Sequence, residues 1–358
     1  MAKIGILGFP NVGKTTLFNA LTGLGALTAA HPFSTMEPNV GVAVVPDQKL
    51  DQAANVEGSA KTVHAQLELL DVPAMAKPGH GGGLAGQFLG RLRDVEAFAV
   101  VLRAFESESV PDDESGVDAV GQAQELLLEL ALADHEVFDR RRAKILKEAT
   151  ADPSKRGPAE AVAAATEVLE AGEPLRQHKW EQDALIAFRD LAPLTLKPSV
   201  WVINAGEDSD AASLVEAVAE VVPDGDTVVA ISAQIEEEAA QLDPADRLEL
   251  FEGLGLGEGA LNRMVQASYS ALGLQSFYTL GPKEAHAWTV RRGATAPEAA
   301  GKIHSDLERG FIRAEVANID DVIEAGGWDP AKADGIVRVE GKGYTVVEGD
   351  VILVRFSV

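Results

Sequence analysis

One short stretch near the N-terminus combines glycines, a lysine and hydroxyls at a spacing suited to phosphate chemistry. Residues 8–15 read Gly-Phe-Pro-Asn-Val-Gly-Lys-Thr, which fits the pattern GxxxxGK[ST]. Glycines let such a loop curl so that successive backbone N–H groups face phosphate oxygens. Lys14 is then expected between the β- and γ-phosphates, the Thr15 hydroxyl on Mg²⁺, and Thr16 at the α-phosphate. The loop residues expected to contact a nucleotide are Asn11, Val12, Gly13, Lys14, Thr15 and Thr16.

Two further oxygen-bearing side chains could complete a magnesium site. Thr35 lies in HPFSTMEPNVG, a segment suited to a switch loop, where a Thr can join the Mg²⁺ shell when a γ-phosphate is bound. Asp71 follows the predicted strand 67–70, where a carboxylate of the second Mg²⁺ shell belongs. The metal prediction is therefore Thr15 and Thr35, with Asp71 in the second shell.

Two later positions are expected to meet the nucleotide base. Asn204-Ala-Gly-Glu207 follows an apolar run, at the place where GTPases carry NKxD. Ser232-Ala233 follows another, where a backbone N–H contacts the base. The Asp of NKxD accepts hydrogen bonds from guanine, whereas Glu207 is one methylene longer and Ala205 replaces the Lys. We expect this difference to favour adenine; a guanine site that has drifted in sequence is the alternative.

Short apolar runs alternate with helical patterns and would position these residues. This alternation predicts an α/β domain with a parallel-rich sheet. A helix is expected near 14–21, directly after the loop. The expected strands are 3–7, 40–45, 67–70, 97–102, 199–203 and 228–231.

The segment 117–191 has a different texture and predicts a helical insert. It is rich in Ala, Leu, Glu, Gln and Arg, with apolar residues at three- and four-residue spacing. The break at 152–158 (DPSKRGP) favours two antiparallel helices. Basic residues gather near this break and make either a solvated face or a binding tip: Arg140, Arg141, Arg142, Lys144, Lys147, Lys155 and Arg156.

From about residue 274 a third texture predicts a small β-rich α+β module. One helix is expected at 296–309, and the expected strands are 287–290, 335–339, 344–346 and 351–356.

Composition excludes several classes of function. The 358 residues include no Cys, which rules out disulfides, thiolate metal sites and thiol-based redox control. The net charge of −25 opposes bulk affinity for nucleic acid, so DNA is not an expected partner. No apolar run is long enough for a membrane span and no signal peptide is expected, so we expect a cytoplasmic protein without a membrane partner. Residues 274–358 are nearly neutral, with 10 Lys and Arg against 13 Asp and Glu, and could approach an anionic surface.

Several long strings resemble one family, the Obg-like ATPases of the YchF type. They are GFPNVGKTTLFNALTG, HPFSTMEPNVG and VVPDQKL near the N-terminus, ELALAD and LTLKP around the helical insert, and AWTVRRGATAPEAAGKIHSDLERGFIRAEV and GDVILVRFSV near the C-terminus. The resemblance spans essentially the whole chain.

This resemblance implies a translation-factor-class P-loop NTPase domain (1–116 and 196–273), a coiled-coil insert (117–195) and an α+β, ubiquitin-like TGS domain (274–358). It also implies ATP and Mg²⁺ as cofactors and ATP hydrolysis. The expected partner is the ribosome, either the large subunit or the whole particle, contacted through the TGS domain and the insert. The alternatives are a nucleotide-binding scaffold with little hydrolysis and a GTPase that assists ribosome assembly.

The sequence departs from common GTPase patterns after Asp71. The expected DxxG reads Asp71-Val-Pro-Ala74, and Met75 stands where Ras-like GTPases carry a Gln that orients water. A thioether cannot orient water as an amide does, so no catalytic residue is assigned and slow intrinsic turnover is expected.

Overall fold

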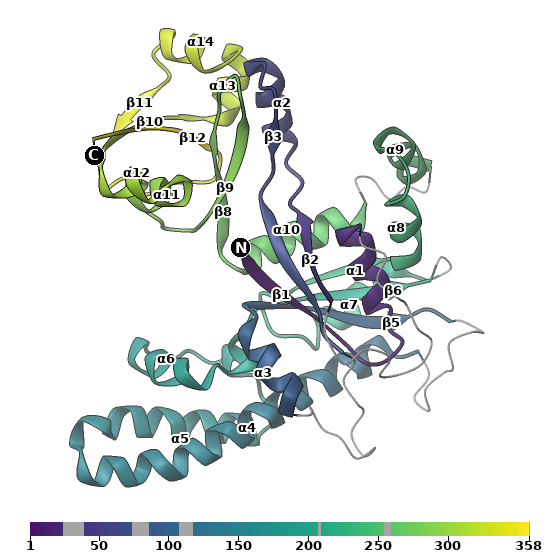
Figure 1. The fold of residues 1–358 in the computed structure, drawn as a ribbon. Helices are drawn as coiled ribbons and strands as arrows, with labels where there is room; N and C mark the ends of the chain where they lie inside the picture. The colour runs from purple at the N-terminus through teal and green to yellow at the C-terminus, as the bar shows by residue number, and fades with distance from the viewer. Residues whose placement is uncertain (24–38, 74–85, 107–116, 207–208, 254–258, 358) are drawn as a thin grey trace. The chain divides into compact units, whose positions relative to one another are not determined.

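A computed structural model describes residues 1–23, 39–73, 86–106, 117–206, 209–253 and 259–357 (Figure 1). The chain divides into two compact units. The first comprises residues 1–42 and 68–271, and the second comprises residues 43–67 and 272–358.

The sheet that carries the N-terminal loop is largely parallel. Among the described residues it has six strands in the order β2-β4-β1-β5-β6-β7, and the pairs β1/β5, β5/β6 and β6/β7 are parallel. This confirms the predicted α/β class. The strands are β1 (Ala2–Leu7), β2 (Asn39–Val44), β4 (Gln66–Asp71), β5 (Ala97–Ala104), β6 (Ser199–Ala205) and β7 (Thr227–Ile231).

The centre of this sheet is covered on both faces. Every residue of β5 and β6 is buried, as expected for parallel strands between two layers of helices. Helix α1 begins directly after the loop, and its C-cap Gly23 adopts a left-handed φ of 65°. The helices of this unit outside the insert are α1 (Lys14–Thr22), α3 (Gly86–Asp94), α7 (Ala211–Ala219), α8 (Ala233–Ala239), α9 (Pro244–Gly253) and α10 (Ala260–Ala271).

The predicted insert is a helical hairpin. Helix α4 (Ala119–Ala151) and helix α5 (Arg156–Glu170) pack side by side (Figure 1). The predicted break falls at Asp152, which caps the short helix η1 (Pro153–Lys155) by accepting from the Ser154 N–H. The chain returns through the short helices η2 (Leu175–Gln177), α6 (Gln182–Phe188), η3 (Arg189–Leu191) and η4 (Leu194–Leu196).

An aromatic cluster holds the insert together. Phe138 of α4 and Phe188 of α6 are fully buried, with ring centroids 5.3 Å apart and an edge-to-face geometry. Trp180 meets Phe188 at 5.1 Å, also edge to face. Such pairs stabilise beyond their buried area.

The second unit is built on a six-stranded sheet in the order β11-β10-β12-β8-β9-β3, again among the described residues. Its strands are β3 (Thr62–Val63), β8 (Leu274–Thr279), β9 (Ala285–Arg291), β10 (Phe311–Asn318), β11 (Arg338–Glu340) and β12 (Asp350–Phe356). Its helices are α2 (Gln48–Glu57), α11 (Ala296–Ile303), α12 (Ser305–Arg309), α13 (Ile319–Ala325) and α14 (Trp328–Ala333). This confirms the predicted small α+β fold.

Several predicted elements of this unit differ in detail. The single helix expected at 296–309 is two helices, because His304 is extended between them and caps α12. The strand expected at 344–346 is reduced to one isolated bridge between Thr295 and Thr345. Strands β8 and β10 were not predicted.

The segment 43–67 packs with the C-terminal strands rather than with the first unit, where the predicted domain range 1–116 had placed it. Strand β3 pairs in parallel with β9, so that Thr62 lies opposite Ala285. Asp47 caps α2 and accepts a 2.6 Å hydrogen bond from the Tyr278 hydroxyl. Glu57 accepts from the Trp328 N–H at 2.9 Å. These partners lie more than 200 residues away in sequence, where local patterns carry no signal.

Within the part of the chain that the structure describes, no helix is long and apolar enough to cross a membrane.

The aromatic cluster yields a stability prediction. Phe138→Ala should lower the free energy of opening of the insert by about 3–5 kcal/mol, because it removes a buried aromatic ring and leaves a cavity. Hydrogen exchange of the α5 amides measures this energy. Leu132→Ala is the matched control, since Leu132 lies on the same helix and is 50% exposed. Equal effects of the two substitutions would contradict the assigned core.

Candidate functional site: the N-terminal loop

The loop between β1 and α1 has the backbone that its glycines suggest. Gly13 has a left-handed φ of 97° and caps the N-terminus of α1. Asn11 is one of only two non-glycine residues in the described chain with positive φ, at 59°. A side chain at Gly13 would place its Cβ 2.3 Å from Asn204 Nδ2, and one at Gly8 would place it 2.5 Å from the Val101 carbonyl oxygen. Both glycines are therefore required by close approach as well as by φ.

Lys14 is folded into its own loop. Its side chain is buried, and Nζ donates to the carbonyl oxygens of Gly8 at 3.1 Å and Phe9 at 2.7 Å. Burial lowers the pKa of Lys14 to about 8, and the charge of Asp71 opposes this shift. A buried ammonium whose hydrogen bonds go to neutral carbonyl oxygens is stabilised by an arriving anion. The loop thus presents a cation, glycine-shaped backbone and a helix N-terminus at one point, which suits phosphate.

Thr15 and Asp71 meet beside Lys14. The Thr15 hydroxyl donates to Asp71 Oδ2 at 3.1 Å, although 56 residues separate the two in sequence. Asp71 is 6% exposed. Asn39 Nδ2 donates to the same oxygen at 3.2 Å. A hydroxyl and a carboxylate are hard oxygen ligands of the kind that Mg²⁺ prefers, so this pair fits the metal that the loop motif implies.

Asn39 was not among the residues predicted for the site. The signal that could have found it is its position at the start of the strand that directly follows HPFSTMEP. Thr35 of that segment lies outside the described residues, as do Glu207, Ala74 and Met75.

Asn204, near the end of β6, connects the loop to the start of α8. Its Nδ2 donates to the Val12 carbonyl oxygen at 3.0 Å, and its Oδ1 accepts from the Ala233 N–H at 3.0 Å. The Ser232 side chain accepts from the Ile235 N–H and caps α8. Ala205 is buried at the end of β6. The structure thus brings Asn204 and Ala233 to the loop, with both groups of the Asn204 amide bonded to backbone.

The helical insert carries its basic residues largely in ion pairs. Arg140 lies 3.5 Å from Glu136 and Arg142 lies 3.8 Å from Asp139. Glu148 pairs with both Arg141 and Lys155, at 3.3 and 2.9 Å. Lys144, Lys147 and Arg156 are exposed. The tip is therefore a mixed surface of both signs rather than a uniformly basic patch.

Two family models match the chain. One, described as a 50S ribosome-binding GTPase, matches residues 3–132. The other, named YchF-GTPase_C and described as a protein of unknown function, matches residues 274–357.

Curated relatives match over nearly the full length. The chain is 39% identical to the ribosome-binding ATPase YchF of Bacillus subtilis (strain 168) over 361 residues, covering 99% of both chains. It is 39% identical to the protein of the same name from Escherichia coli O157:H7, again with 99% of each covered. It is 33% identical to Obg-like ATPase 1 of Pongo abelii, covering 99% of this chain and 92% of that one.

Solved structures agree on the fold. The Schizosaccharomyces pombe YchF GTPase has a TM-score of 0.86 at 27% identity, covering 99% of this chain and 97% of the other. A GTP-binding protein from Pyrococcus horikoshii OT3 has a TM-score of 0.63 at 20% identity, which supports the fold alone.

The bridging amide of Asn204 yields one prediction. Asn204→Ala should weaken nucleotide binding about tenfold or more, because it leaves the Val12 carbonyl of the loop and the Ala233 N–H without partners, at about 1–3 kcal/mol each. Calorimetric titration measures the affinity. Asn19→Ala is the matched control, since Asn19 is an equally buried amide whose Nδ2 donates to Glu237 rather than to the loop. Equal affinity of Asn204→Ala and wild type would remove the bridging role.

The lowered pKa of Lys14 yields a second prediction about the loop, which concerns proton uptake. At pH 8 about half of the Lys14 side chains are neutral in the free protein, and bound phosphates raise this pKa, so ATP binding should take up about half a proton. Uptake should grow as the pH rises from 7 to 9. Calorimetry in buffers of different ionisation enthalpy measures it. Lys197→Met is the matched control. Burial also lowers the pKa of Lys197 to about 8, but its Nζ donates to the Arg93 carbonyl oxygen rather than to the loop. This variant should therefore still take up the proton when it binds ATP. Binding enthalpies that do not depend on the buffer at pH 8 would contradict the assignment.

Proposed function

Since the chain belongs to the YchF family of Obg-like ATPases, we propose that it binds and hydrolyses ATP with Mg²⁺ and that its nucleotide state controls association with the ribosome. The observation that carries the proposal is the loop 8–15, with Lys14 buried at its centre and Thr15 beside Asp71. The relatives named as ribosome-binding ATPases share the full length of this chain.

Phosphate binding would exchange the partners of Lys14. Its ammonium would leave the carbonyl oxygens of Gly8 and Phe9 for the β- and γ-phosphate oxygens. The N–H groups from Asn11 to Thr16 lie at the N-terminus of α1, where the helix dipole favours negative charge. The geometry around Lys14 favours a ligand that carries several adjacent negative charges, as a triphosphate does.

The Mg²⁺ would be held by the Thr15 hydroxyl, with Asp71 behind it and Asn39 orienting Asp71. When bound, the ion neutralises charge that develops on the phosphates. Thr35 is proposed as a further ligand on sequence grounds only.

Adenine is the proposed base. Sequence chemistry supports it, because Glu207 and Ala205 replace the Asp and Lys of the guanine-reading motif. In the structure the Ala233 N–H donates to Asn204 Oδ1, so this N–H would have to exchange its partner to contact a base. Some relatives are named as ATPases and others as GTPases, so a direct comparison of the two nucleotides is required.

The proposed docking surfaces on the ribosome are the helical insert and the C-terminal TGS domain. Exposed Lys144, Lys147 and Arg156 could each contact RNA phosphate. The C-terminal module carries little net charge, so it would be repelled less than the rest of the chain. A cytoplasmic location follows from this partner.

The test measures binding and turnover separately. Wild-type protein should bind ATP at least tenfold more tightly than GTP in calorimetric titrations, and ribosomes should stimulate its single-turnover hydrolysis of ATP. Lys14→Ala should reduce turnover about 10²–10³-fold, because charge stabilisation at the β/γ oxygens is lost. Circular dichroism controls for folding.

Each contrary result has a distinct meaning. Tighter binding of GTP would overturn the proposed base. ATP binding without hydrolysis under any condition would favour a nucleotide-dependent scaffold. Unchanged turnover of a folded Lys14→Ala variant would remove the phosphate role of Lys14.

A further inference from the structure

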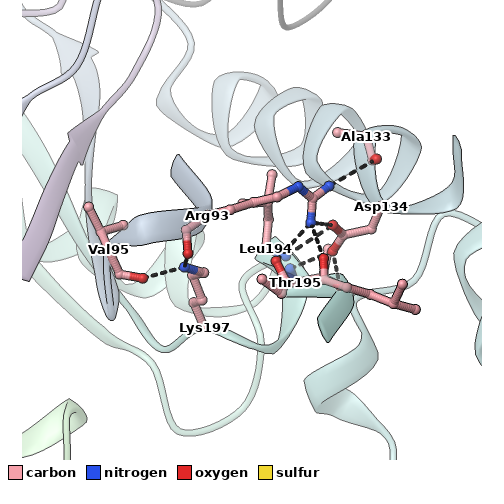
Figure 2. Close-up of polar contacts among 9 residues, drawn as sticks. Arg93, Val95, Ala133, Asp134, Leu194, Thr195 and Lys197 are labelled. Atoms are coloured by element: carbon pink, nitrogen blue, oxygen red, sulfur yellow. Dashed lines mark hydrogen bonds and ion pairs between the residues drawn. The ribbon is translucent and has the colours of Figure 1, made fainter. Parts of the chain in front are cut away.

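A buried polar network joins the middle of α4 to the end of the returning segment of the insert and to the end of α3 (Figure 2). Asp134 of α4 is fully buried. Its carboxylate accepts from the Leu194 N–H at 3.0 Å, the Thr195 N–H at 2.8 Å and the Thr195 hydroxyl at 2.9 Å. Through these bonds the outgoing helix α4 is tied to η4, the last element before the chain returns to the sheet.

Arg93 adds a third element to the network. It lies in the last turn of α3 and pairs with Asp134 Oδ1 at 3.1 Å. Its NH1 also donates to the carbonyl oxygens of Leu191 at 2.9 Å and Ala192 at 2.7 Å. Its NH2 donates to the Ala133 carbonyl oxygen at 3.3 Å. One guanidinium thus contacts both the outgoing and the returning arm of the insert.

Lys197 binds the backbone at the C-terminal end of α3. Its Nζ donates to the carbonyl oxygens of Arg93, at 2.7 Å, and of Val95 (Figure 2). The end of α3 is therefore held by its side chain and by its main chain at once.

The network is better suited to setting geometry than to adding stability. Burial raises the pKa of Asp134, and the hydrogen bonds and Arg93 only oppose that cost. A buried ion pair is often no more stabilising than well-packed apolar residues, and in some proteins its role is to specify one arrangement of its partners. Five hydrogen bonds join the side chains of Asp134 and Arg93 to backbone groups of α4 and of the returning segment. Together they specify how α3, α4 and η4 meet.

The residues that directly follow helix α3 contact strand β1. Helix α3 is the first described element after Asp71–Pro73 along the chain. Just beyond its end, the Glu96 N–H donates to the Lys3 carbonyl oxygen at 2.8 Å. Val95 packs against Gly5, where a Cβ would approach it to 3.3 Å. Both partners lie on β1, the strand that leads into the loop.

A second buried ion pair anchors the insert elsewhere. Arg176 of η2 pairs with Asp226, which is almost fully buried and precedes β7. Asp226 also accepts from the Trp201 indole N–H at 2.9 Å and from the Ser199 N–H at 3.3 Å. This anchor ties the insert to β6 and β7, and the residues that form it lie outside α3.

We propose that Arg93 is the joint that couples the nucleotide state of the loop to the position of the helical insert. The inference rests on the proposed function, because it requires that ATP bind at the loop. A shift of α3 moves the guanidinium, and the guanidinium carries both arms of the insert with it. The Arg176 anchor acts as the fixed support on the other side.

Hydrogen exchange of the isolated full-length protein tests the joint without ribosomes. In wild type, a non-hydrolysable ATP analogue with Mg²⁺ should change the exchange of amides in 119–170 relative to ADP. Arg93→Gln should lose this difference, because it removes the ion pair with Asp134 and the guanidinium N–H groups that donate to both arms of the insert. Arg176→Gln is the matched control: it breaks the other buried ion pair and should keep the difference. Thr195→Val removes one hydroxyl contact to Asp134 and should reduce the difference if Arg93→Gln does not fold.

Calorimetry on the same samples separates the possible failures. Wild type that does not bind ATP overturns the proposed function and the joint together. Wild type that binds ATP while exchange in the insert stays unchanged overturns the joint alone. A nucleotide-dependent difference that persists in Arg93→Gln, or in Thr195→Val at full size, also overturns it. Loss of the difference in both Arg93→Gln and Arg176→Gln reduces the network to a structural clasp and overturns its assignment as a joint.

Discussion

The burial of the Lys14 ammonium is the constraint on which the site depends. A cation withdrawn from water needs compensating partners, and two carbonyl oxygens of its own loop supply them here. Those carbonyls belong to a loop in which Gly8, Asn11 and Gly13 have positive φ. The first N–H groups of α1 have no acceptor within the helix and are available to a ligand. The loop is therefore arranged for an anion before one arrives.

The surrounding fold keeps that arrangement fixed. Asn204 bonds the loop to the start of α8, and Asp71 bonds the first turn of α1 to the end of β4. Each of these side chains is buried and bridges elements that are far apart in sequence. Asp134 and Arg93 likewise join α4, α3 and η4 to one another. Buried polar groups whose partners are all satisfied make such junctions rigid.

The sequence was sufficient where the signal is local. The loop pattern, the alternation of strands and helices, and the break at Asp152 each depend on neighbouring residues, and the structure has them as expected. Sequence was insufficient where pairing is long-range. Asn204 and Val12 are 192 residues apart, and β3 joins a strand more than 200 residues away, so neither contact leaves a periodic trace. The two-way bonding of the Asn204 amide was missed for this reason, as was Asn39 beside Asp71.

The central claim is that Lys14 exchanges backbone carbonyls for the β- and γ-phosphates of a nucleotide. The most direct measurement is the ¹⁵N resonance of the Lys14 side chain during titration with Mg²⁺-ATP and, separately, with AMP. A marked shift of this resonance with ATP and almost none with AMP is the expected result, because AMP lacks both phosphates that Lys14 would contact. Equal shifts with the two nucleotides, or none with ATP, would contradict the account.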